Sequence, residues 1–445
     1  MRVYKIKTSS SLSRWTYFLG IPLSVGLAVA LLFVVFMRDC KEGIGEREIQ
    51  FSVRAPKAVP SKRIVKEMLP LLNYVFFEEG STEIPNRYMA LTKAQAATFN
   101  EGQLGEFKPN SLTGRSIRQM AAYYNILNIL GDRMKKNPRT AILLTGSSGR
   151  GLEHGKARAE TVKRYLVDIF GIEKSRISTE GRDKPKIPSE VPGATKDLAL
   201  LHAEDRRVEI ESISPELMMQ VGNGPHFMLK PMQIVTVVDD PLDSHVLFNV
   251  AGARELLSSW SLEITDDQGK VQRFGPSSQD QESISGNAIL GDRAQGDYKI
   301  VMLGQTKTGK SVSRESSVQL VRREEPKKET VRFTILFAFD QSKTIASYET
   351  FITDIITPLI PDSGIVLIHG HTDITGEPKD NDSLSNQRVQ DARNIIERAS
   401  AADGKRGIKF QTYGFGSNVL YAPFDNYYPE ERFYNRTVII EIVPD

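Results

Sequence analysis

The stretch Ile365-Val366-Leu367-Ile368-His369-Gly370-His371-Thr372-Asp373 decides the fold of the last quarter of this 445-residue chain. Its four aliphatic residues predict a buried strand that ends at glycine and polar residues, so Asp373 lies at the strand's end. Fifteen residues later, Arg388 falls on the first turn of a helix for which Ser385 is the expected N-cap. The two charges then stand on the rim of one cleft, which suits a zwitterionic ligand.

Further residues stand at characteristic spacing around this unit. They are Phe337-Ala338-Phe339-Asp340, Gly370-His371-Thr372-Asp373, Gly376, Asn381, Leu384-Ser385, Arg388 and Asn435-Arg436-Thr437-Val438. Together they resemble the OmpA-like (OmpA/MotB C-terminal) family of peptidoglycan-binding domains, over residues 326–445. Val389 and Thr437 depart from the family, which usually has alanine and arginine there, but neither change removes a ligand group.

The resemblance implies a ligand. In the family, the aspartate of the Gly-His-Thr-Asp motif and the arginine fifteen residues later hold the diaminopimelate side chain of the peptidoglycan stem peptide. It therefore implies that Asp373 accepts the ammonium group and that Arg388 binds the carboxylate. Asn381 and the backbone around Gly376 would shape the loop, and Arg436 would brace the sheet edge beside the cleft. Thr372 and Leu384 complete the predicted site.

The local patterns predict an α/β sandwich for residues 326–445, with helices on one face of a mixed sheet. The expected order is strand 332–339, helix 346–357, strand 364–369, helix 385–400, strand 408–414 and strand 436–443.

An internal repeat precedes this domain. Leu71–Ile84 aligns without gaps on the segment 261 residues later, so that Phe76 matches Phe337. The apolar run 141–146, a helix with Arg158 and the closing segment 205–210 predict a second, degenerate OmpA-like domain at residues 66–213.

This first copy lacks the ligand aspartate. Gly149 stands in its place, and twelve residues separate Gly146 from Arg158, whereas eighteen separate Gly370 from Arg388. Burying an ammonium group without a counter-charge would be costly. We therefore expect the first copy to be structural or to bind a protein partner.

Residues 214–325, between the copies, show short strand-like runs at 233–238, 260–264 and 298–302, separated by turn signals. This spacing predicts a β-sandwich of immunoglobulin-like type with Trp260 in its core. Residues 304–311 satisfy the P-loop pattern, but residues 312–322 alternate as a strand does. A P-loop needs a helix at that place, so we predict a hairpin turn instead.

The N-terminal region predicts a membrane anchor. Residues 15–37 carry no charged side chain, and these 23 residues exceed the roughly 20 that cross a bilayer. Residues 1–14 carry basic residues and no acid, so the positive-inside rule makes them a cytoplasmic tail. Residues 38–65 are charged and contain two prolines, which predicts a linker to periplasmic domains. The expected location is the inner membrane, with outer-membrane association as the alternative, and small residues in the span allow a homodimer.

Composition excludes several classes of protein. A net charge of +3 with 25% charged residues gives no basic excess of the kind that nucleic-acid binding needs. The single cysteine, Cys40, rules out an intramolecular disulfide and, in a linker, thiol catalysis. His369 and His371 would point to the same face of a strand, but no third histidine is near, so we expect no metal site.

The sequence therefore predicts a multidomain chain in which an N-terminal transmembrane helix precedes two α/β OmpA-like sandwich domains that flank an all-β domain. The predicted function is a non-catalytic envelope protein, without cofactors, that anchors a membrane to peptidoglycan. The alternative is a scaffold subunit of an envelope secretion or motility complex, with a protein partner on residues 66–325 and wall binding that only positions the assembly. An envelope hydrolase would need a carboxylate or metal constellation that the spacing does not suggest.

Overall fold

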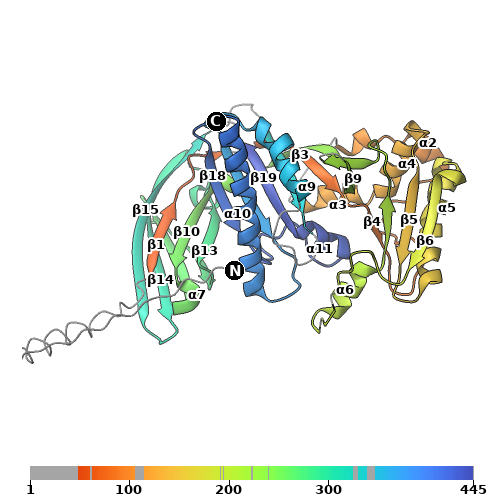
Figure 1. The fold of residues 1–445 in the computed structure, drawn as a ribbon. Coiled ribbons are helices and arrows are strands. Elements are labelled where there is room, and N and C mark those ends of the chain that lie inside the picture. Colours follow the sequence, from red (N-terminus) through yellow and green to blue (C-terminus); the bar gives the residue numbers. More distant parts are fainter. Residues whose placement is uncertain are drawn as a thin grey trace, which may run out of the picture. The chain divides into compact units, whose positions relative to one another are not determined.

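The computed structural model describes residues 49–60, 63–105, 115–190, 192–193, 195–221, 224–238, 240–323, 329–337 and 346–443 (Figure 1). Within these residues no helix is both long and apolar enough to cross a membrane. The predicted span at residues 15–37 and its dimer contact lie outside the described part of the chain, as do Cys40 and Phe339-Asp340.

The chain divides into two compact units, and the first is built largely of strands. It contains the described residues up to Arg54, together with Leu247–Ser283 and Tyr298–Val318. Its strands belong to two sheets. The three-stranded sheet has the order β1 (Gln50–Arg54), β10 (His245–Ala251), β13 (Gln281–Ser285). The five-stranded sheet has the order β12 (Val271–Ser277), β11 (Leu257–Asp266), β14 (Gln295–Thr306), β15 (Ser311–Arg323), β2 (Val59–Pro60). The first unit also contains the short helix α7 (Ala253–Leu256), and the short turns η3 (Leu242–Ser244) and α8 (Gly286–Leu290) belong to the second unit.

Two expectations for this region are confirmed. Trp260 is buried, and its indole Nε1 donates to the carbonyl oxygen of Gln279 at 2.7 Å. Strands β14 and β15 are joined by a tight turn in which Thr306 N–H donates to Lys310 O at 2.8 Å. The segment that imitates a P-loop is therefore a hairpin. The immunoglobulin-like arrangement stays a prediction.

Strands β1 and β2 lie within residues 38–65, where the sequence suggested a linker. In β1 the residues alternate, with Phe51 and Val53 half-buried between exposed neighbours. This short period-two pattern is typical of a strand, and the abundance of charge and proline around it masked it.

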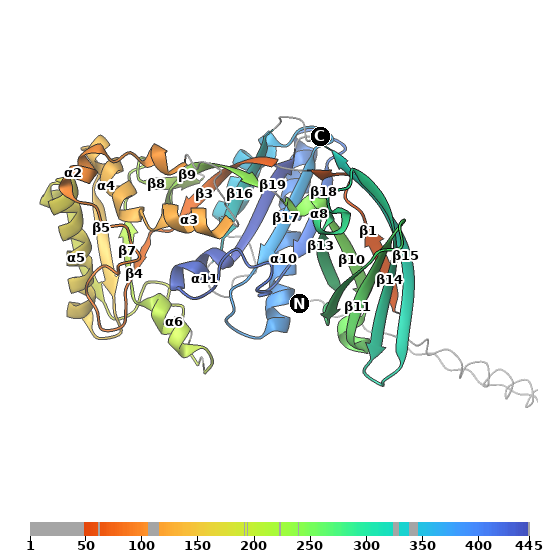
Figure 2. The ribbon, with the colours of Figure 1, turned by 180° about the vertical axis from the view of Figure 1, so that it is seen from behind.

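The second unit contains a seven-stranded sheet (Figure 2). Its order is β18 (Lys409–Gly414), β17 (Ile365–His371), β19 (Thr437–Val443), β16 (Thr330–Leu336), β3 (Arg63–Leu71), β9 (Gly224–Val238) and β8 (Met218–Val221). Strand β3 pairs in parallel with β16 and antiparallel with β9. Segments expected in the linker, the first copy and the β-sandwich thus extend the sheet of the C-terminal domain, which covers the edge of β16 that would otherwise be unpaired.

A separate four-stranded sheet has the order β4 (Tyr74–Phe76), β7 (Arg207–Glu211), β5 (Ile142–Ser147), β6 (Ile177–Arg182). The first copy therefore has the same strand order as β16, β19, β17 and β18 of the second. Directions also agree, because the closing strand is antiparallel to both neighbours in each copy and the remaining pair is parallel. The internal repeat is present as a repeated topology.

Helices complete each copy. Those of the first are α2 (Lys93–Thr98), η1 (Glu101–Gly105), α3 (Arg115–Tyr123), α4 (Ile126–Lys136), α5 (Leu152–Phe170), η2 (Lys174–Arg176) and α6 (Leu198–Asp205). Those of the second are α9 (Ala346–Phe351), a π-helical turn η4 (Ile352–Ile356), η5 (Thr357–Leu359), α10 (Pro378–Ala402) and α11 (Pro429–Asn435). One cluster of buried apolar side chains runs through both copies.

Helix α10 begins seven residues earlier than predicted, so Ser385 is not its N-cap. Pro378 stands at the first helical position, where its fixed φ favours the helix and its missing N–H costs nothing. Ser385 lies inside the helix instead, and its hydroxyl accepts a hydrogen bond from Gly416 N–H at 3.0 Å. Arg388 therefore lies on the third turn.

The same close contact positions the main helix in both copies. A Cβ atom on Gly370 of β17 would lie 2.6 Å from the carbonyl oxygen of Ser385 on α10. On Gly146 of β5 it would lie 1.9 Å from the carbonyl oxygen of Gly155 on α5. Glycine at these strand positions lets the helix approach the sheet closely, and this approach fixes where Arg158 and Arg388 stand.

Candidate functional site

Asp373 follows the end of β17 and is 3% exposed. Its Oδ1 accepts hydrogen bonds from the Thr375 backbone N–H at 3.1 Å and from the Thr375 hydroxyl at 2.6 Å. The preceding residue, Thr372, is buried as well, and its N–H donates to Gly416 O at 2.9 Å. The carboxylate is therefore held in one orientation by its own loop.

Asn381, on the first turn of α10, fixes the same loop from the helix side. Its Nδ2 donates to Thr375 O at 2.9 Å and, more weakly, to Asp373 O at 3.4 Å. Gly376 lies in the left-handed region at φ +85° with open space where a side chain would be. Asn381 thus ties the segment from Asp373 to Thr375 to helix α10.

Arg388 extends from α10 into the interior and is 1% exposed. Its guanidinium carbon lies 4.5 Å from the centre of the Phe337 ring, an arrangement in which the ring face stabilises the cation. The neighbouring helix residues Val389 and Ala392 are buried against the sheet, so the arginine is held by the packing of its helix.

One cavity of about 470 Å³ joins the predicted site residues. All of those expected from the sequence line it, namely Thr372, Asp373, Gly376, Asn381, Leu384, Arg388 and Arg436. A cavity with a fixed carboxylate and guanidinium among its walls can bind a molecule that carries both an ammonium and a carboxylate group.

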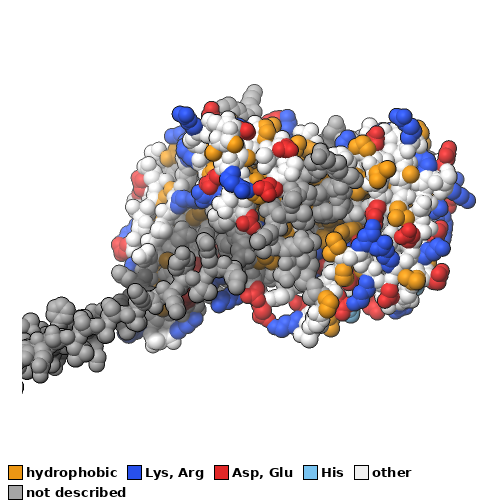
Figure 3. Space-filling model, in the orientation of Figure 1, with side chains coloured by type: hydrophobic (Ala, Val, Ile, Leu, Met, Phe, Trp, Pro, Cys, Tyr) orange, Lys and Arg blue, Asp and Glu red, His pale blue; other side chains and the backbone are white. Residues whose placement is uncertain are grey.

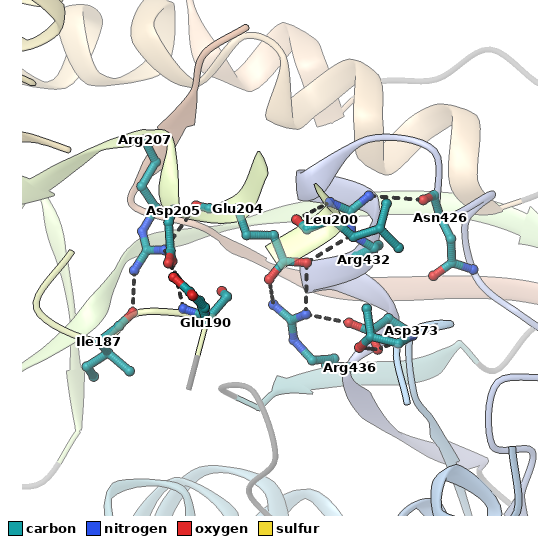
Figure 4. Close-up of polar contacts among 12 residues, drawn as sticks. Ile187, Glu190, Leu200, Glu204, Asp205, Arg207, Asp373, Asn426, Arg432 and Arg436 are labelled. Atoms are coloured by element: carbon teal, nitrogen blue, oxygen red, sulfur yellow. Dashed lines mark hydrogen bonds and ion pairs between the residues drawn. The ribbon is translucent and has the colours of Figure 1, made fainter. Parts of the chain in front are cut away.

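Arg436 has a more direct part than bracing the sheet edge. Its Nη1 lies 2.5 Å from Asp373 Oδ2, and its guanidinium also contacts both carboxylate oxygens of Glu204 at 3.2 Å (Figure 4). Burial alone would lower the pKa of Arg436, but the carboxylates of Glu204 and Asp373 outweigh it and raise that pKa. The arginine therefore stays charged between two acids.

The sequence did not suggest Thr375, which holds Asp373, nor Glu204 and Arg432, which lie behind Arg436. Glu204 is fully buried on α6 of the first copy, and Arg432 Nε on α11 donates to its Oε1 at 2.9 Å. Burial raises the pKa of Glu204, but Arg436 and Arg432 outweigh it and lower that pKa. No local pattern marks Glu204, because its partners lie more than two hundred residues away.

The corresponding cleft of the first copy is organised differently. Arg158 on α5 is fully buried and donates to three backbone carbonyl oxygens, those of Ser81 at 2.9 Å, Ser147 at 2.8 Å and Glu78 at 3.2 Å. Burial, with Arg206 and Arg150 nearby, lowers the pKa of Arg158 to about 10. Gly149 has φ +64° and donates its N–H to Asp183 O at 2.8 Å. In the first copy the guanidinium of Arg158 is thus hydrogen-bonded to backbone carbonyl oxygens.

His369 and His371 do share a face, as the strand pattern predicts, and their ring nitrogens Nδ1 and Nε2 lie 2.9 Å apart. His369 Nε2 also lies 3.4 Å from Glu441 Oε1. Among the described residues no group of three or more His, Cys, Asp or Glu side chains is arranged to hold a metal ion.

No protein-family model and no curated protein matches this chain. Forty-two chains of solved structures match it. The peptidoglycan-associated lipoprotein from Burkholderia pseudomallei is 17% identical over 25% of this chain and 89% of its own, with a TM-score of 0.20. The cell wall anchor of the T6SS from Pseudomonas aeruginosa is 21% identical over 25% and 80%, with a TM-score of 0.20.

The periplasmic domain of Helicobacter pylori MotB is 19% identical over 26% of this chain and 82% of its own, with a TM-score of 0.21. These likenesses are low and cover about a quarter of the chain, so they carry no weight in assigning its function.

Proposed function

We propose that this protein is a non-catalytic envelope protein that binds peptidoglycan through the diaminopimelate of the stem peptide. The observation that carries the proposal is the single cavity of about 470 Å³ whose walls include both Asp373 and Arg388. Diaminopimelate carries an ammonium and a carboxylate on one side-chain end, and these two residues offer the complementary charges. The motif around them supports this ligand over other zwitterions.

With the predicted membrane span at residues 15–37, such binding would tie a membrane to the wall from the periplasmic side. Asp373 would accept the ammonium and Arg388 the carboxylate. Arg436 would hold Asp373 from behind, while Thr372, Gly376, Asn381 and Leu384 shape the cavity. The role requires binding alone, so no residue is assigned a catalytic step.

Co-sedimentation of the full-length protein with purified sacculi tests this proposal, with Asp373→Ala and Arg388→Ala beside the wild type. Losing one partner of a buried, charge-assisted contact costs roughly 2–5 kcal/mol, enough to abolish pelleting at micromolar protein. Glu397→Gln, on the exposed side of α10, is the matched control and should pellet as the wild type does. If the wild-type protein stays in the supernatant, wall binding is wrong.

A scaffold role is the second candidate, because the first copy carries exposed apolar side chains beside a cavity. Ile187 and Ile213 are 62% and 88% exposed, and both line a cavity of about 700 Å³. Exposed apolar residues around a hollow are typical of protein contact sites. Under this role, Ile213→Asp would release a protein partner from the envelope fraction while sacculus binding stays unchanged.

A further inference from the structure

The guanidinium of Arg436 lies between two carboxylates that come from the two copies of the repeat (Figure 4). Asp373 belongs to the second copy and lines the cavity, whereas Glu204 belongs to the first copy and does not. The first copy thus supplies a buried charge, and one side chain, that of Arg436, separates it from Asp373, the proposed partner of the ligand ammonium. This contact gives the degenerate copy a place in the site.

The hydrogen bonds of Asp373 show why that charge matters. A carboxylate offers about four acceptor positions. Thr375 fills two on Oδ1, and Arg436 fills one on Oδ2. A ligand ammonium at Asp373 must therefore use Oδ2 and lie next to the Arg436 cation.

Two cations at one carboxylate repel each other, and the repulsion is strong where water is excluded. If Glu204 were neutral, Asp373 would be the one acid in a cluster with Arg436 and Arg432, and the net positive charge would repel an ammonium group. Glu204 supplies a second counter-ion to Arg436 through both of its oxygens. With Glu204 charged, the two acids together balance Arg436 and Arg432, which also donates to Glu204 at 2.9 Å, so the net positive charge beside Asp373 is removed.

The contact between the copies is built to hold Glu204 in place. Phe433 of α11 packs against Tyr74 and Phe76 of β4 with ring centres 5.4 and 5.5 Å apart. At the mouth of the cavity, Asp197 Oδ2, from the first copy, accepts a hydrogen bond from Gly376 N–H at 3.0 Å. Packing and polar contacts thus position α6 against the site.

We propose that Glu204 is a specificity-determining residue of the C-terminal site, because its charge on Arg436 makes the cavity select ligands that carry an ammonium group over ligands that carry carboxylates alone. The proposal rests on the proposed function, since it concerns the same cavity. Replacing Glu204 by a neutral residue adds one net positive charge beside Asp373. Affinity for an ammonium should then fall, and affinity for a dicarboxylate should stay equal or rise.

Two probes separate these effects. Meso-diaminopimelic acid carries ammonium and carboxylate groups, and pimelic acid has the same carbon chain and carboxylates without nitrogen. Binding of each to the full-length protein is measured by titration calorimetry. For Glu204→Gln, we expect the affinity ratio of diaminopimelate to pimelate to fall about tenfold from its wild-type value. Glu204→Asp keeps the charge but draws it back from Arg436, so its ratio should lie in between.

Arg87→Gln is the matched control. Arg87 of the first copy pairs with the buried Glu430 on α11, so its loss loosens the same contact between copies without changing the charge beside Arg436. For Arg87→Gln, the affinity ratio of diaminopimelate to pimelate should equal the wild-type ratio. If Glu204→Gln does not fold, Glu204→Asp against Arg87→Gln decides the matter, since a lower ratio in the first alone supports the proposal.

Equal ratios in all variants, or an equal fall in Glu204→Gln and Arg87→Gln, would overturn the proposal, because Glu204 would then act through packing. In that case wild-type binding to diaminopimelate and to sacculi would leave the wall-binding function standing. A wild-type protein that binds neither probe and does not pellet with sacculi would overturn both.

Discussion

The two copies of the repeat share a strand order and a close contact between helix and sheet, but the surroundings of their central arginine differ. In each, a strand glycine lets the main helix approach the sheet, and an arginine follows on that helix. Arg158 of the first copy donates to three backbone carbonyls, whereas Arg388 of the second lines a cavity with Asp373. The same residue type at the same place thus donates to backbone carbonyls in the first copy and lines the cavity of the proposed site in the second.

The two copies also differ in the length of the loop between the strand glycine and the arginine. The second copy has six more residues between its strand glycine and its arginine, and they form the loop of Asp373, Gly376 and the first turns of α10. In the first copy the carbonyl oxygens on Arg158 come from Glu78, Ser81 and Ser147, and Gly149 stands on the shorter loop where the second copy has Asp373. The longer loop of the second copy thus places a carboxylate in the same cavity as Arg388, and the shorter loop of the first copy has glycine there.

The largest expected effect is a loss of stability when Arg158 of the first copy is replaced. Arg158→Ala leaves three carbonyl oxygens without a donor, and hydrogen bonds to a charged group are worth roughly 1.5–3 kcal/mol each. We expect the free energy of unfolding to fall by about 4 kcal/mol while the folded protein still binds sacculi. Urea denaturation followed by far-UV circular dichroism measures the first quantity, and co-sedimentation the second.

Arg388→Ala should show the opposite pattern. The Arg388 guanidinium lies on the Phe337 ring and lines the cavity, so we expect sacculus binding to disappear while the variant stays folded. Two results would contradict the different roles of the two arginines. One is that Arg158→Ala abolishes sacculus binding, and the other is that Arg388→Ala unfolds the protein without a specific effect on binding.

A second contrast concerns matched glutamates on the closing strands. Glu441 pairs with Leu367 across the second copy, and Glu211 pairs with Leu143 at the same register in the first. Glu441 is 2% exposed and contacts Arg332 Nη2 at 2.8 Å, whereas Glu211 contacts the partly exposed Lys186. Glu441→Gln should therefore lower the free energy of unfolding by about 3 kcal/mol, and Glu211→Gln by about 0.5 kcal/mol or less.

The contribution of Glu441 should also depend on pH. Burial raises its pKa, but Arg332, His369 and Arg63 outweigh it, so the pKa lies well below its ordinary value of 4.5. A lowered pKa in the folded state makes the contribution complete above about pH 4.5 and lost as the pH falls below it. The stability difference between the wild type and Glu441→Gln, measured from pH 7 to pH 3, should stay constant and then shrink at the acid end.

The sequence predicted the parts of this molecule that depend on nearby residues. The strand at Ile365–His371, the hairpin at 304–311 and the repeat were all recognisable, because each has a local pattern of burial or turns. The predicted site residues from Thr372 to Arg388 line one cavity for the same reason, since a strand end, a loop and a helix bring them together within a short stretch, and Arg436 joins them from just before the start of the neighbouring strand β19.

What the sequence missed depends on distant pairings. Strand β3 joins β16, which follows it by more than 250 residues, and no local pattern says which sheet a short apolar strand enters. Glu204 was missed for the same reason, because its role is defined by Arg432 and Arg436. The early start of α10 was missed because charged residues 377–383 hid the signal of Pro378.

A smaller effect is expected at the loop glycines. Gly376 and Gly149 both have positive φ and open space for a side chain, so alanine at either position strains the backbone by about 1 kcal/mol without a clash. Both variants should lose this stability in urea denaturation. Only Gly376→Ala should also weaken sacculus binding, by about three- to tenfold, because its loop carries Asp373. Equal binding by both variants would show that the loop conformation does not matter to the ligand.

The smallest expected effect is the most informative about the first copy. Gly149→Asp restores the carboxylate that the repeat alignment places there, in a protein whose own site is removed by Asp373→Ala. We expect no sacculus binding to return, because Arg158 still donates to three carbonyls and the loop is still six residues shorter. Co-sedimentation of this double variant beside Asp373→Ala measures the difference. Recovery of pelleting would mean that the missing carboxylate alone prevents the first copy from binding peptidoglycan. The shorter loop and the contacts of Arg158 would then be no obstacle to binding.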